Sequence, residues 1–356
     1  MDVKVDGKTL TQVLVRYGIS GGIVDVQPFF DYVKPEKGTV KVIYGVTLAD
    51  GRKRIVKLLN EPEESRSSRE NVEKQSRFSE HLRNRGIDTP KRYSAEGTYC
   101  TQTMMAGVPC VTTVEDWSGE EIRFINPEIS QKIGALMARM HAISLEDGLK
   151  LDAETLFSAA YDNDVDAWLQ FTELVKAEGI DGATVARITA LRQEKLTKIR
   201  DRWNALPRCA VQGDVSVNNL VLAEDGHLKV FDYNNAGDEV CVGDLILEGL
   251  LTAYEMDLPE GVPQSSRDQL FAAFVKGYLS ARPLTPDEQE LAWEIYTLWH
   301  GLWFTRVVYN EDSLQKLLER GEVEKANQSL MDMLRDMEQE NIGLFSSTND
   351  ERTAEL

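Results

Sequence analysis

The stretch that most constrains the fold of this chain is 211–232, VQGDVSVNNLVLAEDGHLKVFD. Two short apolar runs flank the turn dipeptide Asp225-Gly226, a pattern that predicts a β-hairpin. If this dipeptide forms a two-residue turn, Asn219 faces Asp232, and directly opposed residues have Cβ atoms roughly 5 Å apart. The sequence therefore predicts that an amide and a carboxylate meet at the open end of a hairpin.

A second carboxylate, Asp214, lies on the loop that leads into this hairpin. Together with Asn219 and Asp232 it offers oxygen ligands of the kind that Mg²⁺ prefers when phosphate oxygens complete its coordination. An Asp-Gly hairpin alone does not indicate a metal, so a plain surface hairpin with polar loop residues is the alternative interpretation.

The organisation of the chain is β-rich first and helical afterwards. Its 356 residues exceed the size of a single hydrophobic core, which predicts two lobes. Short turns separate three β-type runs, at 23–30, 39–48 and 53–59, which predicts an antiparallel meander. A capping box beginning at Ser67 predicts a helix to about Arg85. A further strand is expected at 98–105, and the chain turns helical after Pro127.

Charge and cysteine usage exclude several classes of partner. The formal net charge of −19 argues against nucleic acid, since binding to phosphate backbones needs a basic surface. A negative surface would attract cationic small molecules, although a high net charge more often serves only to keep a protein soluble. The four cysteines are scattered without zinc-ligand spacing, which is typical of free thiols in a reducing compartment. We therefore expect a soluble cytoplasmic protein without a membrane partner.

The motif around Asp214 resembles that of the aminoglycoside phosphotransferase family, small-molecule kinases that share the protein-kinase fold. Members carry H-G-D-x-x-x-x-N, then a hairpin and an aspartate; this chain has Gln212-Gly213-Asp214, Asn219 and Asp232. The resemblance covers residues 39–250. It implies an α+β, bilobal protein-kinase-like fold with a small antiparallel-sheet N-lobe and a larger helical C-lobe.

The resemblance also implies boundaries and roles. The nucleotide-binding lobe would be 1–102, the hinge 103–109 and the helical C-lobe 110–345. The polar low-complexity residues that follow, 346–356, predict a flexible tail. Asp214 would be the catalytic base, and Asn219 and Asp232 would bind Mg²⁺. Gln212 departs from the family histidine, which usually has a supporting hydrogen-bonding role.

Lys57 and Gln75 would form the nucleotide-facing pair. Lys57 lies on the expected third strand, where kinases place a phosphate-contacting lysine; a solvent-facing lysine is the alternative. Gln75 falls at the position of the family's helix glutamate and could orient Lys57 by a hydrogen bond, or be an ordinary polar residue of the helix. Gly38 occupies the position of the phosphate-covering loop, although that loop lacks GxGxxG.

The expected hinge would place the backbone of Thr103 and Met105 against the purine base. Asp244 would cap the following helix. Three further acidic residues could meet an ammonium group or cap and solvate a helix: Asp162, Asp164 and Asp166.

The function that follows is an ATP- or GTP-dependent, Mg²⁺-dependent kinase. Its acceptor would be a hydroxyl of a small molecule, with an aminoglycoside or another cationic alcohol as the narrower expectation. The alternatives are a nucleotide-binding regulatory module with impaired catalysis, suggested by Gln212 and Gln75, and a relative that acts as a protein serine/threonine kinase. The histidines lack ligand spacing, which argues against a metallohydrolase.

Overall fold

The computed structural model describes residues 7–62, 65–155 and 167–346. The chain forms two compact units. The first comprises Met1–Phe124, Ala142–Leu156 and Ala210–Asp238, and the second comprises Ile125–His141, Phe157–Cys209 and Glu239–Leu356. The loop and hairpin around Asp214 therefore group with the sheet, although we expected them in the helical lobe.

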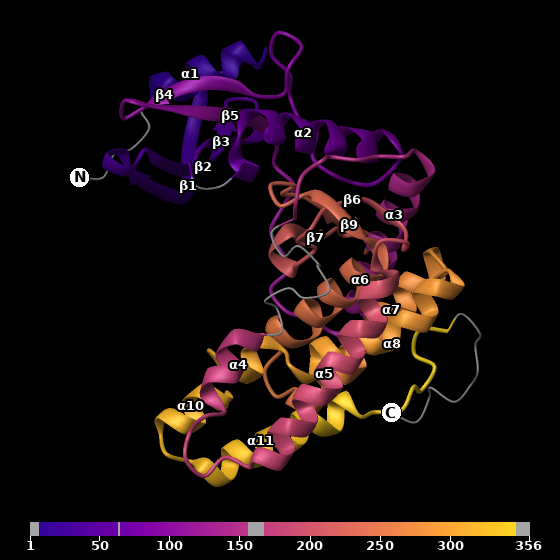
Figure 1. Ribbon diagram of the computed structural model, residues 1–356. Helices are drawn as coiled ribbons and strands as arrows, with labels where there is room; N and C mark the ends of the chain where they lie inside the picture. Colours follow the sequence, from indigo (N-terminus) through magenta and orange to yellow (C-terminus); the bar gives the residue numbers. More distant parts are fainter. Residues whose placement is uncertain (1–6, 63–64, 156–166, 347–356) are drawn as a thin grey trace. The chain divides into compact units, whose positions relative to one another are not determined.

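The first unit combines an antiparallel sheet, two helices and a hairpin (Figure 1). Its elements are α1 (Gly7–Arg16), β1 (Ile23–Lys34), β2 (Thr39–Leu48), β3 (Lys53–Asn60), α2 (Arg69–Asn84), β4 (Thr101–Met105), β5 (Val108–Asp116), β7 (Leu220–Leu222) and β8 (Leu228–Val230). Short 3₁₀ turns lie at η1 (Pro35–Lys37), η2 (Ser65–Ser67) and η4 (Val217–Asn219). The expected meander is present, with strand order β1-β2-β3-β5-β4.

The two faces of the sheet differ in what they pack against. Alternate residues of β2, from Val40 to Leu48, are buried in a core cluster that also contains Leu10 and Leu14 of α1. The intervening residues point to the opposite face, because side chains alternate along a strand. Lys57 pairs in register with Ile43 and therefore lies on that opposite face.

The sequence predicts a hinge between two lobes at residues 103–109, but these residues lie within the sheet. They form the hairpin between β4 and β5, in which Met105 pairs with Val108 and the turn residues Ala106 and Gly107 both have positive φ. Glycine readily adopts this conformation, and the chain therefore reverses here. The sheet continues to Asp116, so the exit from it comes after β5.

Helix α2 begins one residue later than its sequence signature indicated. The Ser68 hydroxyl accepts a hydrogen bond from the Asn71 backbone and is the N-cap, whereas the Ser67 hydroxyl donates to Glu61. The helix then runs to Asn84, close to the expected end.

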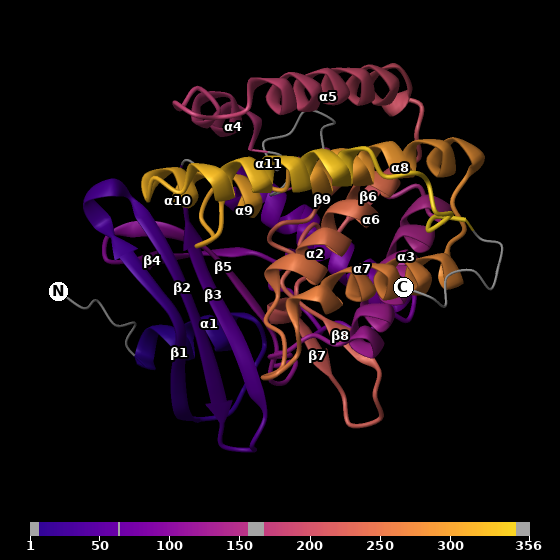
Figure 2. The same ribbon diagram turned by 90° about the horizontal axis from the view of Figure 1, so that it is seen from below.

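Strands β7 and β8 form the expected hairpin (Figure 2). Their register differs from the one that the Asp-Gly signature predicted. Leu220 pairs with Val230, which places Asn219 opposite Phe231 rather than Asp232. The cause is a three-residue loop that ends in Gly226 at φ 82°, the alternative hairpin connection with a glycine in the left-handed region. Asp232 itself has φ 56°, so strand alternation no longer sets the direction of its side chain.

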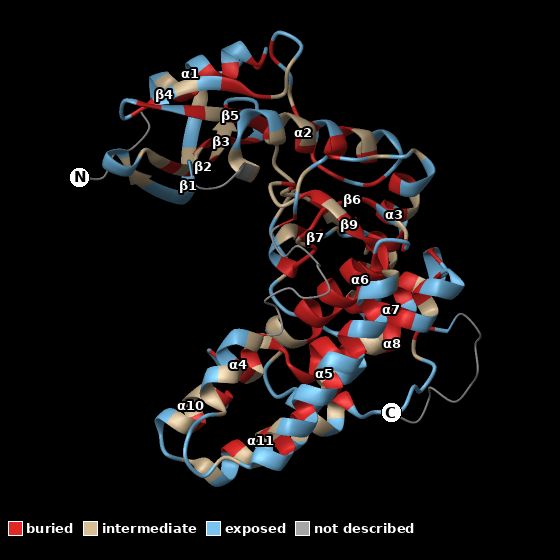
Figure 3. Cartoon of the chain, viewed as in Figure 1, coloured by how far each residue is buried: buried red, intermediate tan, exposed pale blue. Residues whose placement is uncertain are grey.

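The second unit is helical. Its elements are α4 (Trp168–Leu174), α5 (Gly182–Trp203), α6 (Cys241–Leu250), the π-helical turn η5 (Leu251–Glu255), η6 (Gln264–Ser266), α7 (Arg267–Ala281), α8 (Pro286–Gly301), α9 (Phe304–Val307), α10 (Leu314–Glu319) and α11 (Val323–Met337). Three elements have residues in both units: α3 (Pro127–Glu146), β6 (Arg208–Val211) and β9 (Gly237–Val240). Helix α6 is buried along its whole length (Figure 3).

Two glycines allow α3 and α7 to cross closely. A Cβ on Gly134 would lie 2.0 Å from the Phe274 carbonyl oxygen, and one on Gly277 would lie 1.9 Å from that of Gln131.

Across the described ranges, no helix combines the length and apolarity of a membrane span. Asp162, Asp164 and Asp166 lie outside the described residues, as does the tail from residue 347.

A buried polar network in the second unit accounts for Asp244. Rather than capping α6, its carboxylate lies 2.9 Å from His141 Nε2, while Nδ1 of the same ring lies 2.8 Å from the Tyr278 hydroxyl. Arg282 donates to that hydroxyl as well. Burial alone would lower the pKa of His141, but the hydrogen bonds and charges of Asp244 and Cys241 together outweigh it and raise the pKa to about 9.

This pair predicts a stability loss at alkaline pH. Histidine in the unfolded chain loses its proton near pH 6.5, whereas His141 in the folded protein holds it to about pH 9. The contribution is therefore complete below about pH 6.5 and lost as the pH rises to about 9, at up to roughly 1.4 kcal/mol per pH unit for one proton. Urea unfolding from pH 6 to 9.5 should show this decline in wild type and a shallower one in His141→Gln. Equal slopes would contradict the assignment.

Candidate active site

Lys57 lies between two carboxylates. Its Nζ is 3.1 Å from Asp232 Oδ1 and 3.4 Å from Glu115 Oε1, and both Lys57 and Glu115 are buried. Burial by itself would raise the pKa of Asp232, but the charge and hydrogen bond of Lys57 bring that pKa below its ordinary value. The structure thus brings the expected phosphate-contacting lysine against the expected metal-binding aspartate.

Glu115 is the functional-site residue that the sequence reasoning missed. It pairs in register with Ile55, two residues before Lys57, and therefore shares the face of the sheet on which Lys57 lies. Its other oxygen is 3.2 Å from Arg92 Nη2. The resulting row Asp232–Lys57–Glu115–Arg92 alternates in sign, which compensates each buried charge. An acidic residue inside the strand-like run 108–116 was the available signal.

The sequence predicts a hydrogen bond between Gln75 and Lys57, but Gln75 has a different partner. It is 1% exposed on α2, and its Nε2 donates to the Asn234 carbonyl oxygen at 3.0 Å. Gln75 Oε1 has no hydrogen-bond partner among the described residues. Gln75 therefore connects α2 to the segment after Asp232, and the part expected of it is taken by Glu115.

Gln212 joins the loop of Asp214 to Asp232. Its Nε2 donates to the Asp232 carbonyl oxygen at 2.7 Å, and its Oε1 accepts from the Asp214 backbone N–H at 2.8 Å. A side-chain amide has both a donor and an acceptor, so one residue serves both segments. The expected supporting role of this position is thus fulfilled by glutamine.

The substitution Gln212→Glu tests this bridge, because it changes only one of the two hydrogen bonds. The glutamate keeps the acceptor for Asp214 but replaces the donor to Asp232 with a buried oxygen that faces a carbonyl. We expect the free energy of unfolding to fall by about 1–3 kcal/mol, the cost of an unpaired buried polar group. Gln212→His, which retains one donor and one acceptor, should remain closer to wild type in the same urea titration. Equal stability of the glutamate and histidine variants would contradict the bridge.

Asn219 offers an oxygen toward a cation. Its Nδ2 donates to the Asp214 carbonyl oxygen at 2.9 Å and approaches the Ser216 hydroxyl, so Oδ1 is the end of the amide that remains available. Its backbone oxygen accepts from Phe231, the neighbour of Asp232. Among the described residues, no three His, Cys, Asp or Glu side chains gather around a metal position. An amide and a carboxylate nevertheless fit Mg²⁺ held chiefly by phosphate oxygens.

Asn235 is a second residue that the sequence reasoning missed. Its Nδ2 donates to Asp214 Oδ2 at 3.0 Å, and its Oδ1 accepts from Arg66 at 3.4 Å. A polar pair after the hairpin, Asn234-Asn235, was the only sequence signal, and it resembles ordinary loop polarity.

The remaining expected nucleotide contacts lie in the β1–β2 turn and on strand β4. Gly38, at φ 65°, closes the β1–β2 turn, where its carbonyl oxygen accepts from Asn60. Thr103 pairs with Cys110 and Met105 with Val108. Met105, Val108 and Cys110 all belong to the core cluster on the face opposite Lys57. Thr103 and Met105 therefore lie on the edge strand β4 rather than in a segment that leaves the sheet, and the contact of their backbone with the purine base stays a prediction.

An aromatic pair lies on the face that carries Lys57. The Phe29 ring stacks on Trp117 with centroids 5.2 Å apart and planes at 10°. Phe29 sits at a β-bulge and lies over Gly45, where a Cβ would approach it to 2.6 Å. Gly45 is paired with Ile55, so the stack shares the Lys57 side of β3.

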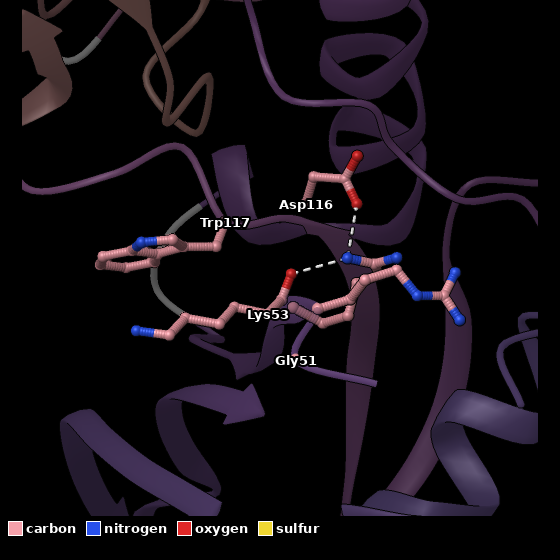
Figure 4. A pocket seen from close by; sticks show the side chains of 6 residues that line it. Gly51, Lys53, Asp116 and Trp117 are labelled. Carbon is pink, nitrogen blue, oxygen red and sulfur yellow. Dashed lines mark hydrogen bonds and ion pairs between the residues drawn. The ribbon is translucent and has the colours of Figure 1, made fainter. Parts of the chain in front are cut away.

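A cavity of about 500 Å³ opens beside this stack, at the start of β3 and the end of β5 (Figure 4). It is lined by Gly51, Arg52, Lys53, Arg54, Asp116 and Trp117. Figure 4 shows the Asp116 carboxylate and the Lys53 carbonyl joined to one guanidinium, that of Arg54. The cavity includes none of the catalytic or metal-binding residues expected from the sequence.

Comparison with known proteins relates this arrangement to kinases. An amicoumacin kinase in complex with AMP-PNP, Ca²⁺ and Ami is 17% identical, with 90% of this chain and 93% of that chain covered at a TM-score of 0.55. A microcompartment-associated aminopropanol kinase is 15% identical, with 92% and 95% covered at 0.56. An aminoglycoside phosphotransferase from Alicyclobacillus acidocaldarius is 13% identical, with 88% and 93% covered at 0.54. No curated protein matches the sequence.

These structures share the fold of this chain and confirm the α+β, kinase-like architecture expected from the sequence. A model of the phosphotransferase enzyme family matches residues 38–284, well over half of the chain. The chain therefore belongs to the phosphotransferase enzyme family, the family that the motif around Asp214 resembled.

Proposed function

We propose that this protein is an ATP- or GTP-dependent, Mg²⁺-dependent kinase that phosphorylates a hydroxyl group of a small molecule. The observation that carries the proposal is the Gln212 bridge, which fixes Asp214 relative to Asp232 while Asp232 is paired with Lys57. A base, two oxygen ligands and a buried cation within one compact unit are what phosphoryl transfer requires. The bridge also weakens the case for a module with impaired catalysis.

The roles of the residues follow from their chemistry. Lys57 would bind the α- and β-phosphates, and its carboxylate partners hold the ammonium in place. Asn219 and Asp232 would hold Mg²⁺, which neutralises phosphate charge when bound. Asp214 would orient the acceptor hydroxyl and take its proton, because an ionised carboxylate is an adequate base at neutral pH.

The purine base would lie on the Lys57 face of the sheet. The Phe29–Trp117 pair supports this placement, because aromatic rings stack readily on bases. Nothing in this pair distinguishes adenine from guanine.

The acceptor we favour is a cationic alcohol such as an aminoglycoside or another amino alcohol. The net charge of −19 supports this choice, and two of the structurally similar proteins are an aminopropanol kinase and an aminoglycoside phosphotransferase. We also propose a cytoplasmic location, since all four cysteines are free and buried.

A matched panel of acceptors tests the proposal. Purified protein with Mg²⁺ and ATP or GTP would be assayed for nucleoside diphosphate release and, by ³¹P NMR, for a new phosphate ester. Amino sugars, amino alcohols and neutral sugars would form the panel. We expect acceptor-dependent turnover that EDTA abolishes and Mg²⁺ restores. Nucleotide binding without transfer to any member of a broad panel would overturn the proposal.

A further inference from the structure

We infer that Asn235 is a positioning residue for Asp214, holding one carboxylate oxygen so that the other faces the acceptor hydroxyl. The inference rests on the proposed function, because it assigns to Asp214 the part of the base. Asn235 Nδ2 lies 3.0 Å from Asp214 Oδ2. Asp214 Oδ1 accepts no hydrogen bond from the described residues. One oxygen is thus fixed, and the second is left to accept a proton.

The orientation of the Asn235 amide follows from its second partner. The Arg66 guanidinium, which only donates, lies 3.4 Å from Asn235 Oδ1. The oxygen end of the amide therefore faces Arg66, and the N–H₂ end faces the carboxylate. A flipped amide would set two donors together on one side and two acceptors together on the other, so Arg66 and Asp214 jointly select a single orientation.

The backbone reinforces the contact. Gly213, with φ 76°, lies so close to Asn235 that an added Cβ would be 2.4 Å from the Asn235 carbonyl oxygen. The loop that carries Asp214 therefore packs directly on the main chain of Asn235 while the side chain holds the carboxylate. Because both contacts come from one residue, the distance between loop and amide has little freedom to vary.

The chemistry also explains why asparagine suits this position. An aspartate there would place two carboxylates about 3 Å apart, and such a pair retains a proton to higher pH. An amide stabilises the ionised base without competing for its proton. Asn235→Asp, which keeps the shape and reverses this property, is therefore the informative substitution.

Steady-state kinetics from pH 5 to 9 test the inference. In Asn235→Asp, the acidic limb of the kcat/KM profile should move upward by at least about one pH unit, because protonation of the paired carboxylates removes the base. In Asn235→Ala, kcat should fall about 10- to 100-fold, the range for a lost hydrogen bond to a charged group, while KM for the nucleotide stays within about twofold. Asn84→Asp is the matched control, since it adds the same charge on the exposed last residue of α2.

A second readout separates this inference from the proposed function. Carboxyl ¹³C NMR titration, with the Asp214 signal assigned by its loss in Asp214→Asn, should move to higher pH in Asn235→Asp whether or not any acceptor is turned over. If wild type transfers phosphate but neither the pH profile nor the titration moves, the positioning role is wrong and the kinase assignment stands. If the titration moves in a protein that transfers no phosphate, the contact is real and the proposed function fails. Lower stability of the variants with unchanged pH behaviour would indicate a merely structural role and overturn the inference.

Discussion

Replacing Asp214 by asparagine should reduce kcat about 10²- to 10⁴-fold, the usual contribution of a general base. The amide is nearly isosteric and can still accept the hydrogen bond from Asn235, so the loop should keep its conformation. It cannot take a proton from an acceptor hydroxyl. Rapid-quench measurement of single turnovers would isolate the chemical step, and nucleotide affinity should stay near that of wild type because Lys57 and Asp232 are unchanged.

Asp225→Asn is the matched control for this loss. It makes the same chemical change on the exposed turn of the β7–β8 hairpin and should leave kcat within about twofold, as surface substitutions usually have small effects. Retention of full activity by Asp214→Asn would remove the base from the proposed reaction, and with it the reason for placing the acceptor hydroxyl at this loop.

The strands and helices nearest to the site could be predicted from the sequence because their signals are local. The turn residues before Thr39 and around Gly51 delimit β2 and β3, and both strands occur within one residue of the expected bounds. The motif 212–219 identified the loop for the same reason. The hairpin register was predicted wrongly by one residue, since a glycine suits both two- and three-residue loops.

The partners of the functional residues could not be predicted in this way. Glu115 reaches Lys57 only because β5, rather than β4, pairs with β3, and strand order is a tertiary property. The hinge was predicted at the wrong place for the same reason, since strand pairing is not visible in the sequence. A turn at Gly107 ends β4 whether the chain then leaves the sheet or returns to it as β5. Gln75 was assigned from its position on a helix face, but its partner is the Asn234 backbone.

Replacing Glu115 by glutamine should cost about 3–5 kcal/mol of the free energy of unfolding, the usual effect of removing one partner from a buried ion pair. Arg92 would lose its carboxylate partner, and Lys57 would keep only Asp232. Both cations are almost fully buried, so water can replace little of the lost interaction. Urea unfolding measures the loss. Glu120→Gln, the same change at an exposed residue beyond β5, should stay within about 0.5 kcal/mol of wild type.

The double variant Glu115→Gln, Arg92→Gln discriminates between a paired and an independent contribution. Removing both members of the pair eliminates the uncompensated guanidinium, so its loss should be smaller than the sum of the two single losses. Nucleotide affinity provides the functional test, because a Lys57 held only by Asp232 would be misdirected when phosphates and Mg²⁺ compete for that carboxylate. We expect weaker nucleotide binding in Glu115→Gln than in Gln75→Ala. The reverse order would mean that Gln75 on α2 orients Lys57, as expected from the sequence, and that Glu115 on β5 has only a structural role.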